Sequence, residues 1–526
     1  MQEKPWLSDS SHPPIKSTTE PASDHHPQTK LIPESPNGSS AAFCETHPFQ
    51  RGQSGRRRKA AFTLTLVWSS TVALHLVPGG SWLVLGVTAM MGLHVLRILL
   101  SQPDVPPDPF TSDDVEDYPY ISILVAAKNE EAVIRSLVQN LCTLDYPIER
   151  YDVWLIDDYS TDNTPAILER LARRYDHLRV VRRAENAGGG KSGALNQVWP
   201  LTQGEIIAVF DADAQVPSNL LRQVVPLFAA ERAGAVQVRK AIANASTNFW
   251  TRNQAIEMVL DACIQQQRVA NGGIGELRGN GQFVRRVALE DCNGWNEETI
   301  TDDLDLTLRL HLNQWDIDFL PYPAVKEEGV TRAVGLWHQR NRWAEGGFQR
   351  YLDYWRLLVQ NRLGLRKSID LCVFYTTQYL IPTAAVPDLL MAVARGRLPI
   401  LTPLTALTLV TPLVGMVVGL RRVRAYQQAA LAPLSNKPRS PLAALSDQVV
   451  ANLSILFQSI CGLIYMCHWL VVIASTVIRI SIRPKRLKWV KTVHYGTLDG
   501  ALDGADGMVD STLADGDDPL LDLSES

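Results

Sequence analysis

Two long apolar runs follow a polar N-terminal stretch. They cover residues 60–78 and 81–100 and are joined by a glycine pair at 79–80. Each run is about long enough to cross a bilayer core of roughly 30 Å as a helix; a buried hairpin of a soluble protein is the alternative. The basic cluster 56–59 directly precedes the first run. Because positive residues favour the cytoplasmic side, we expect two transmembrane helices within 56–100 and a cytoplasmic chain after them.

From residue 120 to about 345, short apolar runs alternate with stretches of helical spacing. The helical stretches are 131–142, 163–175, 191–199 and 218–231. The apolar runs are 121–127, 152–158, 178–183, 205–213 and 235–240. This alternation predicts a mainly parallel sheet with right-handed crossovers. Such sheets bind ligands at the carboxyl ends of their strands.

Three further apolar blocks lie at 369–393, 398–420 and 449–480. Three spans would leave the basic segment 483–491 outside, against the preference of positive charge for the cytoplasm. Either the last block therefore hides a hairpin, or a segment within 398–450 lies at the membrane interface. We expect interfacial and transmembrane helices over 346–482.

Composition fills in the remaining segments. Residues 1–55 are polar and lack an apolar period, which predicts disorder, and 101–119 is a Pro- and Asp-rich linker. The 526 residues carry 51 Lys and Arg against 55 Asp and Glu. Nine of those acids follow Leu498, so 483–526 reads as a basic juxtamembrane segment and an acidic, disordered tail. The seven cysteines form no C-x-x-C pair, which argues against a zinc module or a disulfide framework.

Acidic residues stand where two of the predicted strands end. Asp157 and Asp158 close the second run, and Asp211 and Asp213 close the fourth. Residues i and i+2 of a strand face the same way, so Asp211 and Asp213 can converge. Two carboxylates with water and phosphate oxygens suit Mg²⁺, and Mn²⁺ is possible. A solvated turn is the alternative, but the position after a buried run favours a metal site.

A third acidic motif, Thr301-Asp302-Asp303, opens a predicted helix at 304–313. Thr301 resembles a helix N-cap. The helix dipole lowers the pKa of acids in the first turn, although a base that works near neutral pH needs the opposite shift.

Two basic segments complete the candidate chemistry. The glycine-rich stretch 186–196 contains Lys191 and nearly matches a P-loop, but Glu185 stands where that motif requires glycine. Lys191 can still approach a diphosphate; a flexible surface loop is the alternative. The segment 339–343, Gln-Arg-Asn-Arg-Trp, combines cations that match phosphate geometry with a flat indole face. A membrane-interface belt of Arg and Trp is its alternative.

The order of these motifs resembles that of the membrane-bound family 2 glycosyltransferases, which include cellulose, chitin and hyaluronan synthases. The resemblance covers about 120–345 and the flanking spans. It implies a GT-A-like, Rossmann-like mainly parallel α/β domain that is cytoplasmic and lies between transmembrane helices. The implied roles are uridine contact for Asp158 or Asp157, a metal held by Asp211 and Asp213, diphosphate contact for Lys191, Arg340 and Arg342, an acceptor site at Gln339 and Trp343, and Asp303 as the base. The family often has T-E-D at the base motif, so Asp302 stays open beside Asp303.

Three stretches carry a narrower resemblance: 49–76, 279–286 (GNGQFVRR) and 483–496. They are similar to the cyanobacterial β-monoglucosyldiacylglycerol synthases. This resemblance implies glucose transfer from UDP-glucose to 1,2-diacylglycerol at a lipid bilayer, with inversion and no nucleic-acid partner. A processive β-polysaccharide synthase and a non-catalytic membrane scaffold that binds a nucleotide-sugar are the alternatives.

Overall fold

The computed structural model describes residues 55–431 and 441–483. The N-terminal segment predicted to be disordered, apart from Gly55, and the basic segment and acidic tail, apart from Arg483, lie outside the described residues.

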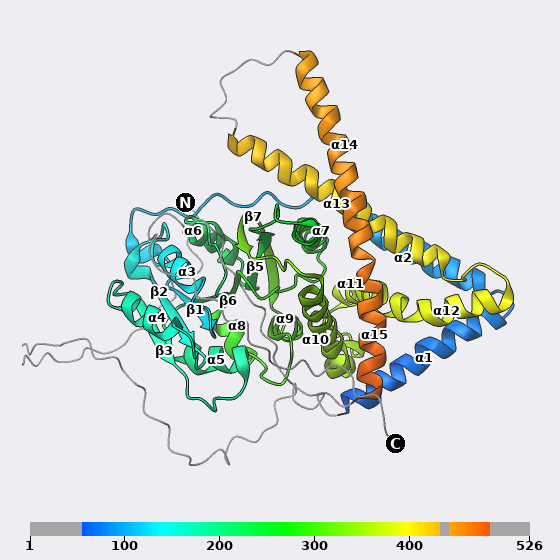
Figure 1. The fold of residues 1–526 in the computed structure, drawn as a ribbon, viewed down its shortest axis with the longest axis horizontal. Coiled ribbons are helices and arrows are strands. Elements are labelled where there is room, and N and C mark those ends of the chain that lie inside the picture. Colours follow the sequence, from blue (N-terminus) through cyan, green and yellow to red (C-terminus); the bar gives the residue numbers. More distant parts are fainter. Residues whose placement is uncertain (1–54, 432–440, 484–526) are drawn as a thin grey trace, which may run out of the picture. The chain divides into compact units, whose positions relative to one another are not determined.

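A seven-stranded sheet forms the centre of the α/β domain (Figure 1). Its strand order is β3-β2-β1-β4-β6-β5-β7, and only β6 runs antiparallel to its neighbours. The strands are β1 (Ile121–Ala127), β2 (Tyr151–Asp157), β3 (Leu178–Arg182), β4 (Ile206–Phe210), β5 (Ala233–Ile242), β6 (Gln282–Arg285) and β7 (Asp316–Glu327). The predicted mainly parallel α/β sheet is thus confirmed.

Helices cover both faces of the sheet, which explains the nearly continuous apolar strands. On β1, Ile123 packs into one buried cluster with α3 and α4, while the adjacent Leu124 packs into the other with α5 and α9. The helices between the strands are α3 (Ile134–Leu141), α4 (Thr164–Ala172), α5 (Gly190–Val198), α6 (Leu220–Val224), α7 (Phe249–Ala270), α8 (Arg286–Asp291) and α9 (Asp302–Leu312). Each predicted helical stretch overlaps one of them, although α5 begins one residue before the predicted 191–199.

Apolar helices flank the sheet domain in sequence. They are α1 (Arg56–Leu76), α2 (Gly80–Leu99), α11 (Leu365–Tyr375), α12 (Ile381–Arg395), α13 (Thr402–Leu431), α14 (Pro441–Met466) and α15 (His468–Ile482), and α10 (Ala333–Val359) connects the two parts. Within the described residues, three stretches are long and apolar enough to cross a membrane: 80–99, 402–429 and 448–482. The first predicted span forms α1, which is not among these three.

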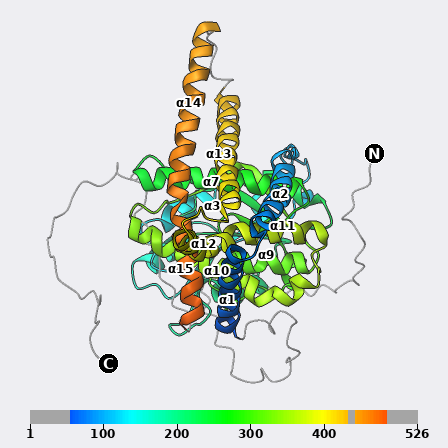
Figure 2. The same ribbon diagram turned by 90° about the vertical axis from the view of Figure 1, so that its right-hand side faces the viewer.

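The C-terminal apolar block contains no hairpin. Helices α14 and α15 are separated only at Cys467, and the chain does not reverse there (Figures 1 and 2). The block at 369–393 is also interrupted. A π-helical turn, Thr376–Leu380, separates α11 from α12. The number of segments that cross the membrane stays a prediction.

Two helical hairpins meet at their tips. Near the α1–α2 turn, His75 Nε2 lies 2.7 Å from Asp388 Oδ1 of α12. The Asp388 carboxylate also accepts hydrogen bonds from the backbone N–H groups of Ile400 and Leu401 before α13. The carboxylate therefore ties the two hairpins together and satisfies backbone donors next to the start of α13.

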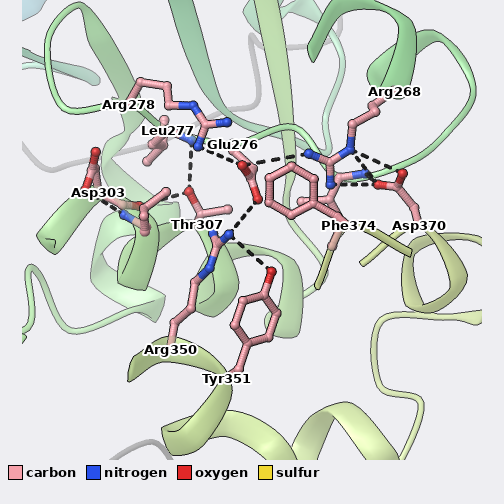
Figure 3. Close-up of polar contacts among 12 residues, drawn as sticks. Arg268, Glu276, Leu277, Arg278, Asp303, Thr307, Arg350, Tyr351, Asp370 and Phe374 are labelled. Atoms are coloured by element: carbon pink, nitrogen blue, oxygen red, sulfur yellow. Dashed lines mark hydrogen bonds and ion pairs between the residues drawn. The ribbon is translucent and has the colours of Figure 1, made fainter. Parts of the chain in front are cut away.

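A buried charge cluster joins the sheet domain to the helices. Glu276 is fully buried, and its carboxylate lies 2.7 Å from Arg278, 3.0 Å from Arg350 of α10 and 3.8 Å from Arg268 of α7 (Figure 3). Burial alone would raise the pKa of Glu276, but the three guanidinium groups outweigh it and hold this pKa well below its usual range. Arg268 also pairs with Asp370 of α11 at 2.9 Å.

We expect Glu276→Gln to destabilise the protein strongly, because three buried cations would lose their shared anion. Breaking a buried ion pair from one side costs roughly 3–5 kcal/mol. Thermal unfolding of the full chain in detergent measures this loss. The control is Asp145→Asn at a surface pair with Arg222, where the Asp145 side chain is 59% exposed and the cost should stay below about 1 kcal/mol. Equal shifts of the unfolding midpoint in both variants would contradict the role of the cluster.

Candidate active site

One cavity of about 1610 Å³ runs from the sheet into the apolar helices. Its polar end lies at the carboxyl ends of the strands, and its apolar end lies among α11–α15. The polar lining includes Asp158, Lys191, Asp211, Asp213, Lys240, Asp302, Asp303, Glu327, Gln339, Arg342 and Trp343. The apolar lining includes Phe374, Ile381, Pro382, Leu409, Pro412, Leu463, Leu470 and Ile473. The cavity thus joins nearly all the predicted site residues to a hydrocarbon-like surface.

The two acids at the end of β2, Asp157 within the strand and Asp158 directly after it, differ in position. Asp158 lines the cavity and pairs with Arg183 and, at 3.7 Å, with Lys128. Asp157 is buried and lies outside the cavity lining. Its carboxylate accepts from the Ser160 backbone N–H at 3.0 Å and lies 3.3 Å from Arg182 Nε. The structure therefore gives Asp157 a role in holding the loop, and uridine contact by Asp158 stays a prediction.

The glycine-rich stretch places Lys191 against Asp211. Gly189, with φ of +79°, stands immediately before α5, and this left-handed conformation favours glycine. The turn aims the Lys191 ammonium at the Asp211 carboxylate, and the two form an ion pair. Burial would lower the pKa of Lys191, but Asp211, Asp302 and Asp303 together raise it above its usual value. Lys191 is therefore a fixed cation at the polar end.

Asp211 and Asp213 fit a metal that is shared with a substrate. Both line the cavity, and Asp213 Oδ2 accepts from the Glu328 backbone N–H at 2.8 Å. Among the described residues, no group of three or more His, Cys, Asp or Glu side chains could hold a metal ion. This donor set does not fit an all-protein cage. It fits Mg²⁺ or a similar ion, which needs only one or two carboxylates when phosphates and water complete its shell.

Asp303 stands in the first turn of α9, which begins at Asp302, two residues earlier than predicted. Thr301 occupies the N-cap position without a side-chain capping bond. Burial first, and the neighbouring Asp302 second, raise the pKa of Asp303 to about 6. The shift is therefore opposite to the helix-dipole expectation, because desolvation disfavours the charged carboxylate more than the dipole favours it.

Helix α9 is fixed to the buried charge cluster. Thr307 Oγ1 donates to the Asp303 backbone carbonyl at 2.9 Å and accepts from the Leu277 N–H at 2.9 Å (Figure 3). Leu277 directly follows Glu276. The cluster thus holds the first turn of α9, and Asp303 with it, in place.

The segment 339–343 divides between two environments. Gln339, Arg342 and Trp343 line the cavity, but Arg340 does not. Arg340 is buried, pairs with Glu257 of α7, and lies 4.1 Å from the centre of the Trp343 ring. Arg340 therefore orients Trp343, and its predicted contact with the diphosphate does not follow from this position.

Sequence reasoning missed Lys240 and Glu327. Lys240 pairs with Glu327 at 3.1 Å and lies 5.4 Å from the centre of the Trp343 ring, and both charged residues line the cavity. Lys240 belongs to β5, a strand recognised from its apolar run. A lysine at the end of a buried run, where parallel strands bind ligands, was the available signal. The sequence gave no such signal for Glu327, because Pro321 and Pro323 lie within β7 and hide the pattern of a strand.

Comparison with known proteins identifies the relatives of this chain. Residues 122–292 match the family model of glycosyl transferase family 2. The β-monoglucosyldiacylglycerol synthase of Nostoc sp. (strain PCC 7120) is 60% identical over 443 residues, which cover 84% of this chain and 90% of that protein. The synthase of the same name from Synechocystis sp. is 53% identical over 456 residues and covers 86% and 92% of the two chains.

A solved structure, the mannosyltransferase PcManGT from Pyrobaculum calidifontis in complex with GDP-Man and Mn²⁺, is also similar. It has 20% identity and a TM-score of 0.47, and the match covers 79% of this chain and 99% of that one. The two synthases match this chain at 60% and 53% identity. With 84–86% of its length matched in this way, the chain belongs to the family of β-monoglucosyldiacylglycerol synthases.

Proposed function

We propose that the chain transfers glucose from UDP-glucose to the free hydroxyl of 1,2-diacylglycerol. The reaction inverts the anomeric centre, so an α-linked donor gives a β-glucosyl lipid that stays in the membrane. The observation that carries this proposal is the single cavity that has carboxylates and cations at one end and apolar helices at the other. The names of the relatives supply glucose and diacylglycerol as the transferred sugar and the acceptor.

The polar end suits a nucleotide-sugar. Lys191 and Arg342 both line it and can neutralise negative charge on the departing UDP. Charge neutralisation of this kind stabilises the transition state more than the ground state, because the charge grows as the sugar–phosphate bond breaks. Asp158 lines the same end, within reach of a donor held there.

Asp211 and Asp213 would hold a divalent cation, Mg²⁺ or Mn²⁺, together with the diphosphate. When bound, this cation supplies further positive charge to the leaving group. The position of both carboxylates on the cavity surface supports the proposal, because a diphosphate in the cavity could share the cation with them.

Asp303 would act as the general base. The acceptor hydroxyl gives its proton to the Asp303 carboxylate while its oxygen forms a bond to the glucose C1. The bond from C1 to the diphosphate breaks at the same time, and UDP leaves on the opposite face. A pKa raised to about 6 keeps Asp303 mostly ionised at neutral pH and improves its match to the proton that it accepts.

The apolar end favours a lipid acceptor over a growing polysaccharide. A processive synthase must lead a polar chain away from the site, whereas residues such as Leu409, Leu463 and Ile473 give a hydrocarbon chain its own environment. We also propose that the catalytic part faces the cytoplasm, because the basic cluster 56–59 forms the first turn of α1.

Product analysis tests the function. Purified protein with labelled UDP-glucose should label a monoglucosyl lipid only when diacylglycerol is added. Label in an ethanol-insoluble polymer, independent of diacylglycerol, would instead indicate a polysaccharide synthase.

The same assay in sealed vesicles tests the orientation of the protein in the membrane. Inside-out vesicles should use external UDP-glucose, and right-side-out vesicles should need permeabilisation. Use by intact right-side-out vesicles would reverse the proposed topology.

A further prediction concerns the general base. Asp303→Asn should lower turnover by roughly 10²–10⁴-fold, the usual contribution of a positioned base, while UDP-glucose still binds. In the intact enzyme kcat/KM should fall as the pH drops through about 6, because Asp303 then becomes protonated. Asp302→Asn removes a charge that raises this pKa, so it should keep turnover and move the acidic limb to lower pH. If Asp302→Asn loses turnover and Asp303→Asn keeps it, Asp302 is the base.

Another prediction concerns the metal. EDTA should abolish turnover, and added Mg²⁺ or Mn²⁺ should restore it. Asp213→Asn should lose metal-dependent binding of UDP, measured by calorimetry. Asp303→Asn is the matched control and should keep that binding, because Asp303 is not assigned to the metal. Full turnover in a metal-free preparation would remove the proposed role of Asp211 and Asp213.

A further inference from the structure

The π-helical turn between α11 and α12 forms part of the cavity surface. Thr377, Gln378 and Tyr379 of this turn line the cavity together with Ile381 and Pro382, which follow it. A π turn inserts one extra residue into a helix and reorients the side chains around it, and such turns often occur at functional sites. Here the turn brings polar side chains to a mainly apolar surface.

Gln378 differs from its polar neighbours in hydrogen bonding. Thr377 donates to the Val373 carbonyl at 3.0 Å, Tyr379 donates to the Ala344 carbonyl at 3.3 Å, and Thr408 across the cavity donates to Thr405 at 2.8 Å. The Gln378 Oε1 atom is buried and has no hydrogen-bond partner among the described residues. The amide nitrogen Nε2 is not among the buried unpaired atoms and makes no hydrogen bond within the described residues, so its N–H groups are available to an occupant of the cavity.

The π turn lies close to the catalytic base. Gly347 of α10 has no side chain, and a Cβ there would collide with the Tyr379 hydroxyl and meet Leu304 Cδ1 at 3.6 Å. Tyr379 follows Gln378, and Leu304 follows Asp303. The absence of a side chain at Gly347 therefore lets the π turn approach the first turn of α9. Because Gln378 and Asp303 line the same cavity, an acceptor whose hydroxyl reaches Asp303 can extend along this turn.

We propose that Gln378 donates a hydrogen bond to an ester carbonyl of the acceptor and so selects an ester-linked lipid; this inference rests on the proposed function. Diacylglycerol has one hydroxyl, whose proton goes to Asp303 in the proposed reaction. Its two ester carbonyl oxygens can only accept hydrogen bonds. The Gln378 N–H groups can donate to such a carbonyl, whereas the amide oxygen cannot. Gln339 also has a buried Oε1 without a partner, but it belongs to α10 beside Arg342 and the donor.

The experiment compares two acceptors, 1,2-dioleoylglycerol and its diether analogue 1,2-dioleylglycerol, which lacks both carbonyls. The purified full-length enzyme with labelled UDP-glucose should prefer the ester in kcat/KM by roughly tenfold. Gln378→Leu should bring this ratio to about one, with the KM for UDP-glucose unchanged. Gln378→Glu keeps the size and polarity but lacks the N–H donor, so it should lose the preference as well.

The matched control is Thr377→Val on the same turn, because its hydroxyl already donates to backbone carbonyls. It should keep the preference for the ester. A tenfold preference that survives both Gln378 variants, or one that falls equally in Thr377→Val, overturns the inference. Where turnover is too slow, the same ratio is measured by binding of the two lipids. If the unmodified enzyme glucosylates neither lipid, the proposed function fails instead.

Discussion

Three arginines converge on one buried carboxylate, Glu276, and this cluster fixes the geometry of the rest of the site. They come from α7, from α10 and from the loop that precedes β6. Buried ions cost solvation energy, which is recovered only when the partners keep their geometry. The cluster therefore admits one arrangement of the sheet domain against the helices. Through Leu277 and Thr307, that arrangement also sets the position of Asp303.

The joint between sheet and helices explains why one cavity can serve two unlike substrates. Parallel strands present charged side chains at their carboxyl ends, whereas α11–α15 present apolar ones. Helix α10 contributes to both parts: Trp343 faces the polar end, while Gly347 allows close contact with the π turn. A water-soluble donor and a lipid acceptor can thus meet at Asp303 without either leaving its preferred environment.

Much of the catalytic half could be predicted from the sequence, because its signals are local. Buried apolar runs identified β1–β5. The acids at the ends of β2 and β4 were recognised as candidate site residues because they come directly after buried runs. The contacts of Arg340 with Glu257 and the burial of Asp157 depend on distant segments, so the motif alone could not separate them from cavity residues. The pKa of Asp303 was expected to fall with the helix dipole, but it rises because tertiary packing buries the group. The π turn carries no sequence signal that hydropathy can detect.

In the proposed reaction the acceptor lipid occupies the cavity between Asp303 and the apolar helices. A photoactivatable diacylglycerol, with its reactive group on one acyl chain, tests this directly by cross-linking and peptide mapping. We expect labelled peptides from 374–412 and 463–473, the segments that supply most of the apolar lining. Unmodified diacylglycerol should compete with the probe and reduce the label. Label confined to surfaces outside the cavity, or label that competition does not reduce, would contradict the account.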